Sequence, residues 1–221
     1  MTPSDKNATQ IKKMRKTEIN LEIIKGAALN GKYDLPCIGS GYATPPKTLL
    51  PFNQAKSSDD DCAGIHFFID DYQFERVWRS PMRYTEMLKR FDCILSPDFS
   101  LYVDMPMAMK IWNIYRSRAI GAYWQRKGLN VIPTLQWADP QTYHFCFNGI
   151  ERNGMVAVST LGAAKSRISK QFWKAGMKEA IRQLHPHTIL LYGSQVNYDF
   201  NGIKVIHYEN NTIERLRSYG R

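Results

Sequence analysis

The chain has 221 residues, a formal net charge of +10, 43% hydrophobic and 12% aromatic residues. This composition excludes an intrinsically disordered chain and predicts one domain with a substantial core. No apolar run approaches the ~20 residues that a membrane span needs, and the polar start has no apolar signal region. We therefore expect a cytoplasmic protein without a membrane partner. The positive charge favours polyanionic partners such as DNA or RNA.

The chain begins with a basic segment at 1–17, which we expect to be a flexible arm. A single α/β domain is predicted over 18–221, with an irregular loop at 34–61 that is rich in Pro, Gly, Ser and Lys. Cationic side chains gather near both ends of the chain. The candidate nucleic-acid contacts are Lys12, Lys13, Arg15, Lys16, Arg215 and Arg217. A solvated basic face that only keeps the protein in solution would explain them equally simply.

Six short apolar runs without alternation predict strands that are covered on both faces, as in parallel α/β proteins. They lie at 65–69, 93–95, 131–135, 155–158, 188–191 and 203–207. Helical segments separate most of them. An eight-stranded barrel typically needs ~250 residues. The predicted fold is therefore α/β, with a mainly parallel sheet of about six strands and flanking helices, as an open sheet or a partial barrel.

Two long helices are predicted between these strands. The first runs from Asp104, a candidate cap, towards Gly128. Its apolar stripe is Met109, Trp112, Arg116, Ala119 or Ile120, and Tyr123. The second runs over 166–184. Its predicted buried residues are Ile168, Phe172, Gly176, Ala180 and Leu184, which keep helical period.

Several clustered motifs resemble the domain-of-unknown-function family numbered 4417. They are Ser96-Pro97-Asp98-Phe99-Ser100, Asp104-Met105-Pro106, Tyr115-Arg116, Val131-Ile132-Pro133-Thr134 and Val156-Ala157-Val158-Ser159-Thr160. The resemblance covers roughly residues 68–193. It implies a protein of the type encoded by bacteria, phages and other mobile elements. It implies no catalytic residue.

Polar, aromatic or glycine residues follow five of the predicted strands. In open α/β sheets, ligands bind beyond the carboxyl ends of the strands, so these residues are expected to border one pocket. The candidate ligand-binding residues are Asp70, Asp98, Trp137, Ser159, Gly193 and Arg116. Two carboxylates on adjacent strands would suit Mg²⁺, the one cofactor that this pattern suggests. Trp137 would stack on a planar group, and Ser159 with the Gly193 amide would face an anion.

Structural roles explain several of these residues as well. Asp98 after Pro97 is also typical of a turn, and Asp104 and Asp139 of helix caps. The sequence contains no zinc motif, nucleophile elbow, dinucleotide fingerprint or helix-turn-helix signature, so it does not decide whether the protein is an enzyme.

Two functions from different classes remain. The first is a phage-type or mobile-element protein that interacts with nucleic acid or a nucleotide through a pocket at the strand ends. The second is a non-catalytic module that binds a host protein or another element-encoded protein.

Overall fold

The computed structural model describes residues 19–41, 44–163 and 166–210. The predicted basic arm and the candidate contacts Lys12, Lys13, Arg15, Lys16, Arg215 and Arg217 lie outside these ranges. Within them, no helix has both the length and the apolar character needed to cross a membrane.

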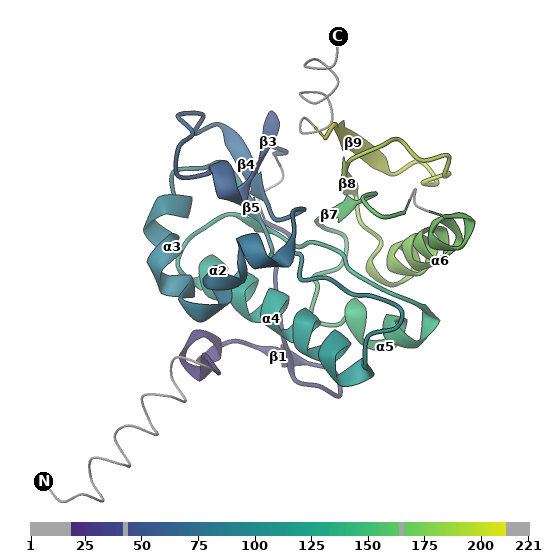
Figure 1. Ribbon diagram of the computed structural model, residues 1–221, viewed down its shortest axis with the longest axis horizontal. Coiled ribbons are helices and arrows are strands. Elements are labelled where there is room, and N and C mark those ends of the chain that lie inside the picture. Colours follow the sequence, from purple (N-terminus) through teal and green to yellow (C-terminus); the bar gives the residue numbers. More distant parts are fainter. Residues whose placement is uncertain (1–18, 42–43, 164–165, 211–221) are drawn as a thin grey trace, which may run out of the picture.

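Seven parallel strands form the centre of the molecule (Figure 1). Four pair in the order β3 (Thr48–Pro51), β4 (Ala63–His66), β5 (Cys93–Leu95) and β6 (Val131–Ile132). Three more pair in the order β7 (Met155–Ser159), β8 (Thr188–Tyr192) and β9 (Lys204–Tyr208). The prediction of a mainly parallel α/β sheet is confirmed.

A short parallel bridge between Thr134 and Ala157 joins the two groups of strands. Its hydrogen bonds run from Leu135 N to Ala157 O and from Ala157 N to Pro133 O, at 2.8 and 2.9 Å. The strands therefore follow one another in chain order from β3 to β9. Proline at 133 removes one backbone donor, which explains why β6 is shorter than the predicted run at 131–135.

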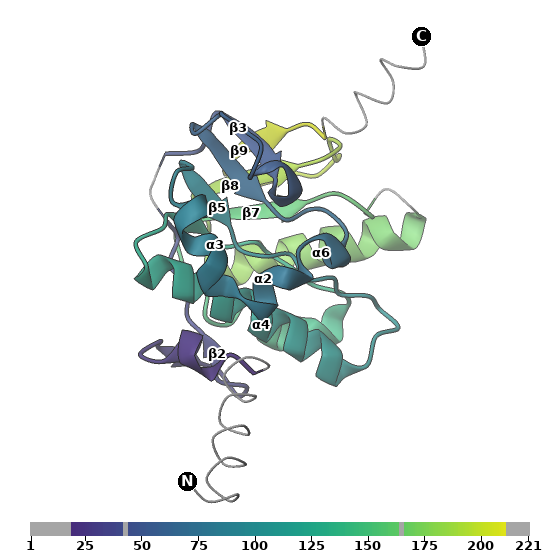
Figure 2. The ribbon, with the colours of Figure 1, turned by 60° about the vertical axis from the view of Figure 1, so that its left-hand side comes forward.

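The sheet curls so that its two outer strands approach each other (Figures 1 and 2). The Tyr208 hydroxyl at the end of β9 donates a 2.6 Å hydrogen bond to the carbonyl of Pro46, just before β3. Alternate side chains from six of the seven strands, all except β4, meet inside the curl, and Phe68 joins them from the segment after β4. The cluster includes Leu49, Cys93, Leu95, Ile132, Met155, Ala157, Leu190, Tyr192 and Tyr208. Of the two predicted forms, the structure is the partial barrel.

Helices cover the outer face of this barrel (Figure 2). They are α2 (Glu75–Arg79), α3 (Pro81–Leu88), α4 (Met107–Arg126), α5 (Tyr143–Cys146) and α6 (Arg167–Leu184). Short 3₁₀ turns are η1 (Leu21–Ile24), η2 (Phe52–Gln54), η3 (Asp71–Gln73) and η4 (Pro140–Thr142), and a small antiparallel hairpin pairs β1 (Leu29–Asn30) with β2 (Leu35–Pro36). The opposite set of strand side chains packs under these helices in the larger core.

The predicted start of α4 and the first part of its buried face were wrong, whereas Arg116, Ala119, Ile120 and Tyr123 are buried as predicted. Asp104 is exposed and does not cap the helix, which follows Pro106. Met109 and Trp112 are 51% and 39% exposed, whereas Lys110 is buried. The reason is electrostatic, because the Lys110 ammonium reaches the Asp139 carboxylate at 2.9 Å and turns its side of the helix inward.

The predicted stripe of α6 was also wrong at its start. Ile168 is 63% exposed, and Trp173 and Met177 are buried instead. The Trp173 indole donates to the carbonyl of Ser159 at the end of β7, which fixes the rotation of the helix. Gly176, Ala180 and Leu184 are buried as predicted.

The segment 34–61, predicted as an irregular loop, contains β2, β3 and η2. Strand β3 pairs with β4 over four residues, and Leu49 is buried. Its apolar run is only two residues long and is followed by proline, which explains why the pattern did not predict it. Proline is compatible with an outer strand, which needs to pair along one side only.

Candidate functional site

A pocket of about 360 Å³ lies beyond the carboxyl ends of β5, β6 and β7, and we call it the main pocket. Three of the predicted residues line it together, namely Asp98, Trp137 and Ser159. Further lining residues are Phe99, Ser100, Tyr102, Gln136, Leu161, Gly162, Phe172 and Trp173. The strand-end rule therefore located a real pocket, with the side of α6 as one of its walls.

Asp98 follows β5 and is partly buried in the main pocket. The pKa of Asp98 is raised to about 7, mainly by burial and also by the negative charge of Asp71, while a hydrogen bond from Gln136 opposes both. Gln136 itself is 5% exposed. Its amide nitrogen donates to the Phe99 carbonyl at 2.7 Å, whereas its Oε1 is buried and has no partner within the described residues. The pocket therefore contains one buried acceptor, Gln136 Oε1, that lacks a donor among the described residues.

The second carboxylate near this site is Asp71 and not Asp70. Asp70 is exposed, caps nothing with its side chain and does not line the pocket. Asp71 accepts hydrogen bonds from the backbone and hydroxyl of Ser100, the latter at 2.8 Å. Burial raises the pKa of Asp71, while the Ser100 hydrogen bonds and the nearby Arg116 lower it. Asp71 follows β4 and Asp98 follows β5, and the charge of Asp71 raises the pKa of Asp98, but Asp71 does not line the main pocket.

Arg116 supports this cluster from outside the main pocket. Its guanidinium carbon lies 3.8 Å from the centre of the Phe99 ring, and its Nη1 forms a 2.8 Å ion pair with Glu75. A third contact, with Asn113 on the same helix, measures 2.7 Å. Arg116 therefore holds the Phe99–Ser100 segment against α2 and α4, and the structure does not place it in the pocket.

Trp137 forms part of the pocket wall and also joins β6 to α6. Its indole nitrogen donates to the carbonyl of Phe172 at 3.2 Å. The ring lies so close to Gly176 that a methyl group there would fall 2.1 Å from the indole nitrogen. Part of the ring is thus used for packing, and Phe172 and Trp173 add aromatic surface to the same wall.

Ser159 lines the main pocket, and its hydroxyl accepts from the backbone of Leu161 at 3.0 Å. Gly193 does not line it. Its φ of +108° and the 2.6 Å that would separate an added methyl from the Thr160 hydroxyl explain why glycine follows β8. The prediction that Gly193 borders the same pocket was wrong, because the turn after β8 borders a separate cavity, which residues 194–197 line.

A second cavity, of about 210 Å³, lies beside the main pocket and shares Ala163 and Trp173 with it. We call it the lysine cavity, because Lys170 and Lys174 line it together with Thr160 and the turn after β8. That turn contributes Ser194, Gln195, Val196 and Asn197. Both lysines are exposed, and neither forms an ion pair with a described residue.

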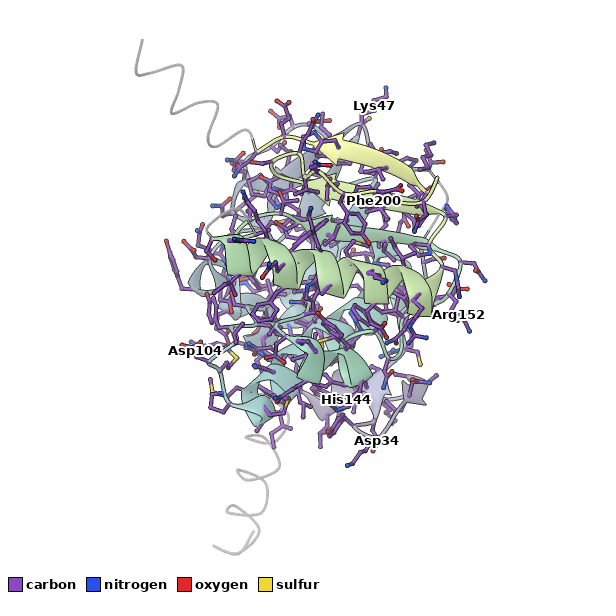
Figure 3. All side chains as sticks on the ribbon, turned by 90° about the vertical axis from the view of Figure 1, so that its right-hand side faces the viewer. Asp34, Lys47, Asp104, His144, Arg152 and Phe200 are labelled. Carbon is purple, nitrogen blue, oxygen red and sulfur yellow. The ribbon has the colours of Figure 1, made fainter. Side chains whose placement is uncertain are left out.

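The lysine cavity belongs to a longer cationic face on α6, which Figure 3 views from the front. Arg167, Lys170, Lys174 and Lys178 are all exposed at helical spacing. The sequence pattern did not single them out, because charges on the outer face of an amphipathic helix are ordinary. Their position beside a pocket is visible only in three dimensions.

Metal binding has limited geometric support in the part of the chain that the structure describes. No group of three or more His, Cys, Asp or Glu side chains there is placed to hold an ion. Asp71 and Asp98 are the closest approach to the predicted Mg²⁺ pair, so Mg²⁺ remains a proposal.

Comparison with protein families gives a decisive match. The model of the family described as "Domain of unknown function (DUF4417)" matches residues 27–209. The chain belongs to this family. The match includes every described strand and helix except η1, and thus both cavities.

Two curated members of similar sequence come from phages. The chain is 42% identical over 151 residues to the "Gene 1 protein" of Mycobacterium phage L5, covering 67% of this chain and 66% of that protein. It is 46% identical over 165 residues to the "Gene 1 protein" of Mycobacterium phage D29, covering 70% of this chain and 61% of that protein. The chain thus matches just under two thirds of each relative. No solved structure matches it.

Proposed function

We propose that this DUF4417 protein binds a phosphorylated nucleoside, either free or as a unit of DNA or RNA. The base occupies the main pocket, and the phosphate lies in the lysine cavity. The observation that carries the proposal is the shared wall of Ala163 and Trp173. It places an aromatic pocket with polar acceptors next to two lysines that form no ion pair with a described residue.

One cavity is aromatic and the other is cationic, which matches the planar base and the anionic phosphate of a nucleotide. The main pocket offers Trp137, Phe172 and Trp173 to a planar ring, and stacking of a base on an aromatic side chain contributes about 1–3 kcal/mol. In the lysine cavity, Lys170 and Lys174 lie one turn apart on α6 and repel each other until an anion neutralises them.

The exposed cationic residues on α6 would also suit the phosphates of a DNA or RNA chain. Arg167 and Lys178 continue the line of the two cavity lysines, and successive phosphates would follow it. Each neutralised phosphate releases counterions, so affinity should fall as salt rises. The cationic residues at both chain ends would add to this effect. The net charge of +10 supports this part of the proposal.

Charge reversal on α6 tests the proposal. The variant Lys170→Glu/Lys174→Glu should lose at least about tenfold in affinity for a nucleoside monophosphate and for a short single-stranded oligonucleotide, measured by calorimetry and fluorescence anisotropy. The matched control is Lys47→Glu/Lys56→Glu, which changes the charge equally at two exposed lysines outside both cavities. Equal affinity in the two double variants would refute the proposal. Titration with and without Mg²⁺ shows whether the ion contributes.

An exposed apolar surface favours the second candidate function, a protein-interaction module. Tyr102, Val103 and Met109 are 60%, 53% and 51% exposed around the start of α4. Trp112, 39% exposed, lies one helical turn after Met109 and packs edge-on against the buried Trp78 at a ring distance of 5.2 Å. Exposed apolar surface of this kind is typical of a protein contact. Loss of a partner protein on Trp112→Ser, with nucleotide binding absent in the unchanged protein, would favour this function.

A further inference from the structure

One buried acceptor in the main pocket, Gln136 Oε1, has no hydrogen-bond donor among the described residues, and it lies beside the carboxyl group of Asp98. The carboxyl group of Asp98 lines the main pocket, and its one amide neighbour is Gln136. The Gln136 amide nitrogen is already bonded to the Phe99 carbonyl, and the Gln136 Oε1 has no partner within the described residues. Because buried acceptors without donors are unfavourable, a ligand that supplies several donors at this position would be bound selectively.

Resting on the function proposed above, we propose that Asp98 and Gln136 select guanine among the bases. Guanine N1–H and one hydrogen of its 2-amino group donate to the two carboxylate oxygens of Asp98. The second hydrogen of the amino group donates to Gln136 Oε1. Guanine is the one common base whose pairing edge has two adjacent donors. A carboxylate accepts two parallel N–H bonds in the same way from arginine.

A guanidinium group presents the same pair of donors, and the surroundings of the pocket argue against it. Lys170 and Lys174 line the adjacent cavity and would repel a second cation. They would instead attract the phosphate of a guanine nucleotide. The aromatic wall of Trp137 and Phe172 also suits the larger, flat purine.

The first test compares ligands on the unchanged protein at about pH 8, where Asp98 is ionised. Guanosine monophosphate should bind at least about tenfold more tightly than inosine monophosphate, which lacks only the 2-amino group, because a site built for a donor rejects an analogue without it. Adenosine monophosphate should bind more weakly still. Ribose 5-phosphate and methylguanidine measure the contributions of phosphate and guanidinium alone.

The possible results separate this inference from the function on which it rests. Equal binding of the guanine, inosine and adenine nucleotides would refute base selection and leave nucleotide binding intact. Absence of binding by all three would refute both. Methylguanidine that binds as tightly as guanosine monophosphate would show a guanidinium site and overturn the choice of guanine.

The second test changes the acceptor itself. Asp98→Asn replaces one acceptor oxygen by a donor amide, which faces a guanine donor. It should abolish the preference for guanosine over inosine monophosphate while leaving affinity for ribose 5-phosphate unchanged. The control Asp104→Asn removes the same charge at an exposed position outside the pocket and should keep the preference. A retained preference in Asp98→Asn, with a normal thermal transition, would overturn the proposal.

Discussion

At the scale of single residues, the carboxyl group of Asp98 has the clearest physical signature. Its pKa is about 7 in the folded protein, against an ordinary value near 4. The folded state therefore binds this proton more tightly than the unfolded chain does. The stability that results is complete below about pH 4 and is lost as the pH rises through 7. Asp71, whose pKa is also raised by burial, titrates beside it.

Asp98→Asn should remove this pH dependence. We expect the variant to be more stable than the unchanged protein at about pH 8, by at most about 4 kcal/mol, and nearly equal to it at about pH 4. Urea denaturation at the two pH values measures the difference. Parallel pH profiles for the two proteins would contradict the assigned cause. Asp104→Asn, at an exposed carboxylate, serves as control.

A second prediction at this scale concerns the contact between Gly176 and Trp137. Alanine normally stabilises a helix by about 1 kcal/mol relative to glycine. Here its methyl group would meet the indole at 2.1 Å, and overpacking of this kind costs about 1–3 kcal/mol. Gly176→Ala should therefore destabilise the protein in chemical denaturation. Trp137→Phe, which shortens the ring, should recover part of that loss in the double variant, and failure to do so would place the strain elsewhere.

At the scale of helices and strands, the hydrophobic pattern predicted an element correctly where local sequence alone determined its structure. Strand β5 has the predicted bounds, because Cys93, Ile94 and Leu95 are apolar and polar residues flank them. At the start of helix α4, the buried side of the helix is set by the Lys110–Asp139 ion pair and not by the apolar pattern. Asp139 is remote in sequence, so no local pattern could reveal the pair.

That ion pair also gives a prediction about how α4 is attached. Lys110 and Asp139 are 3% and 8% exposed, and removal of one partner leaves a buried charge. Breaking such a pair costs about 3–5 kcal/mol. Lys110→Met should lower the free energy of unfolding by about that amount, whereas Lys110→Met/Asp139→Leu should recover much of it. A loss under 1 kcal/mol for the single variant would show that water reaches the pair.

At the scale of the whole molecule, the candidate site was partly predictable. The rule that ligands bind beyond strand ends placed Asp98, Trp137 and Ser159 in one pocket. It could not place Gly193, because the side on which a turn passes depends on how Thr160 and Leu161 pack. Neither could it find Lys170 and Lys174, whose role depends on the shape of the loops opposite α6.

The bridge between Thr134 and Ala157 has a mechanical consequence. Among the described residues, only two backbone hydrogen bonds connect the four-stranded part of the sheet to the three-stranded part, so we expect the two parts to flex at this junction. The main pocket lies across it, with Asp98 and Gln136 on one part and Ser159 and Trp173 on the other. A ligand in the pocket would contact both parts and restrict their motion relative to each other. Binding should therefore slow hydrogen exchange at the Leu135 and Ala157 amides more than at the amides in the first half of β8.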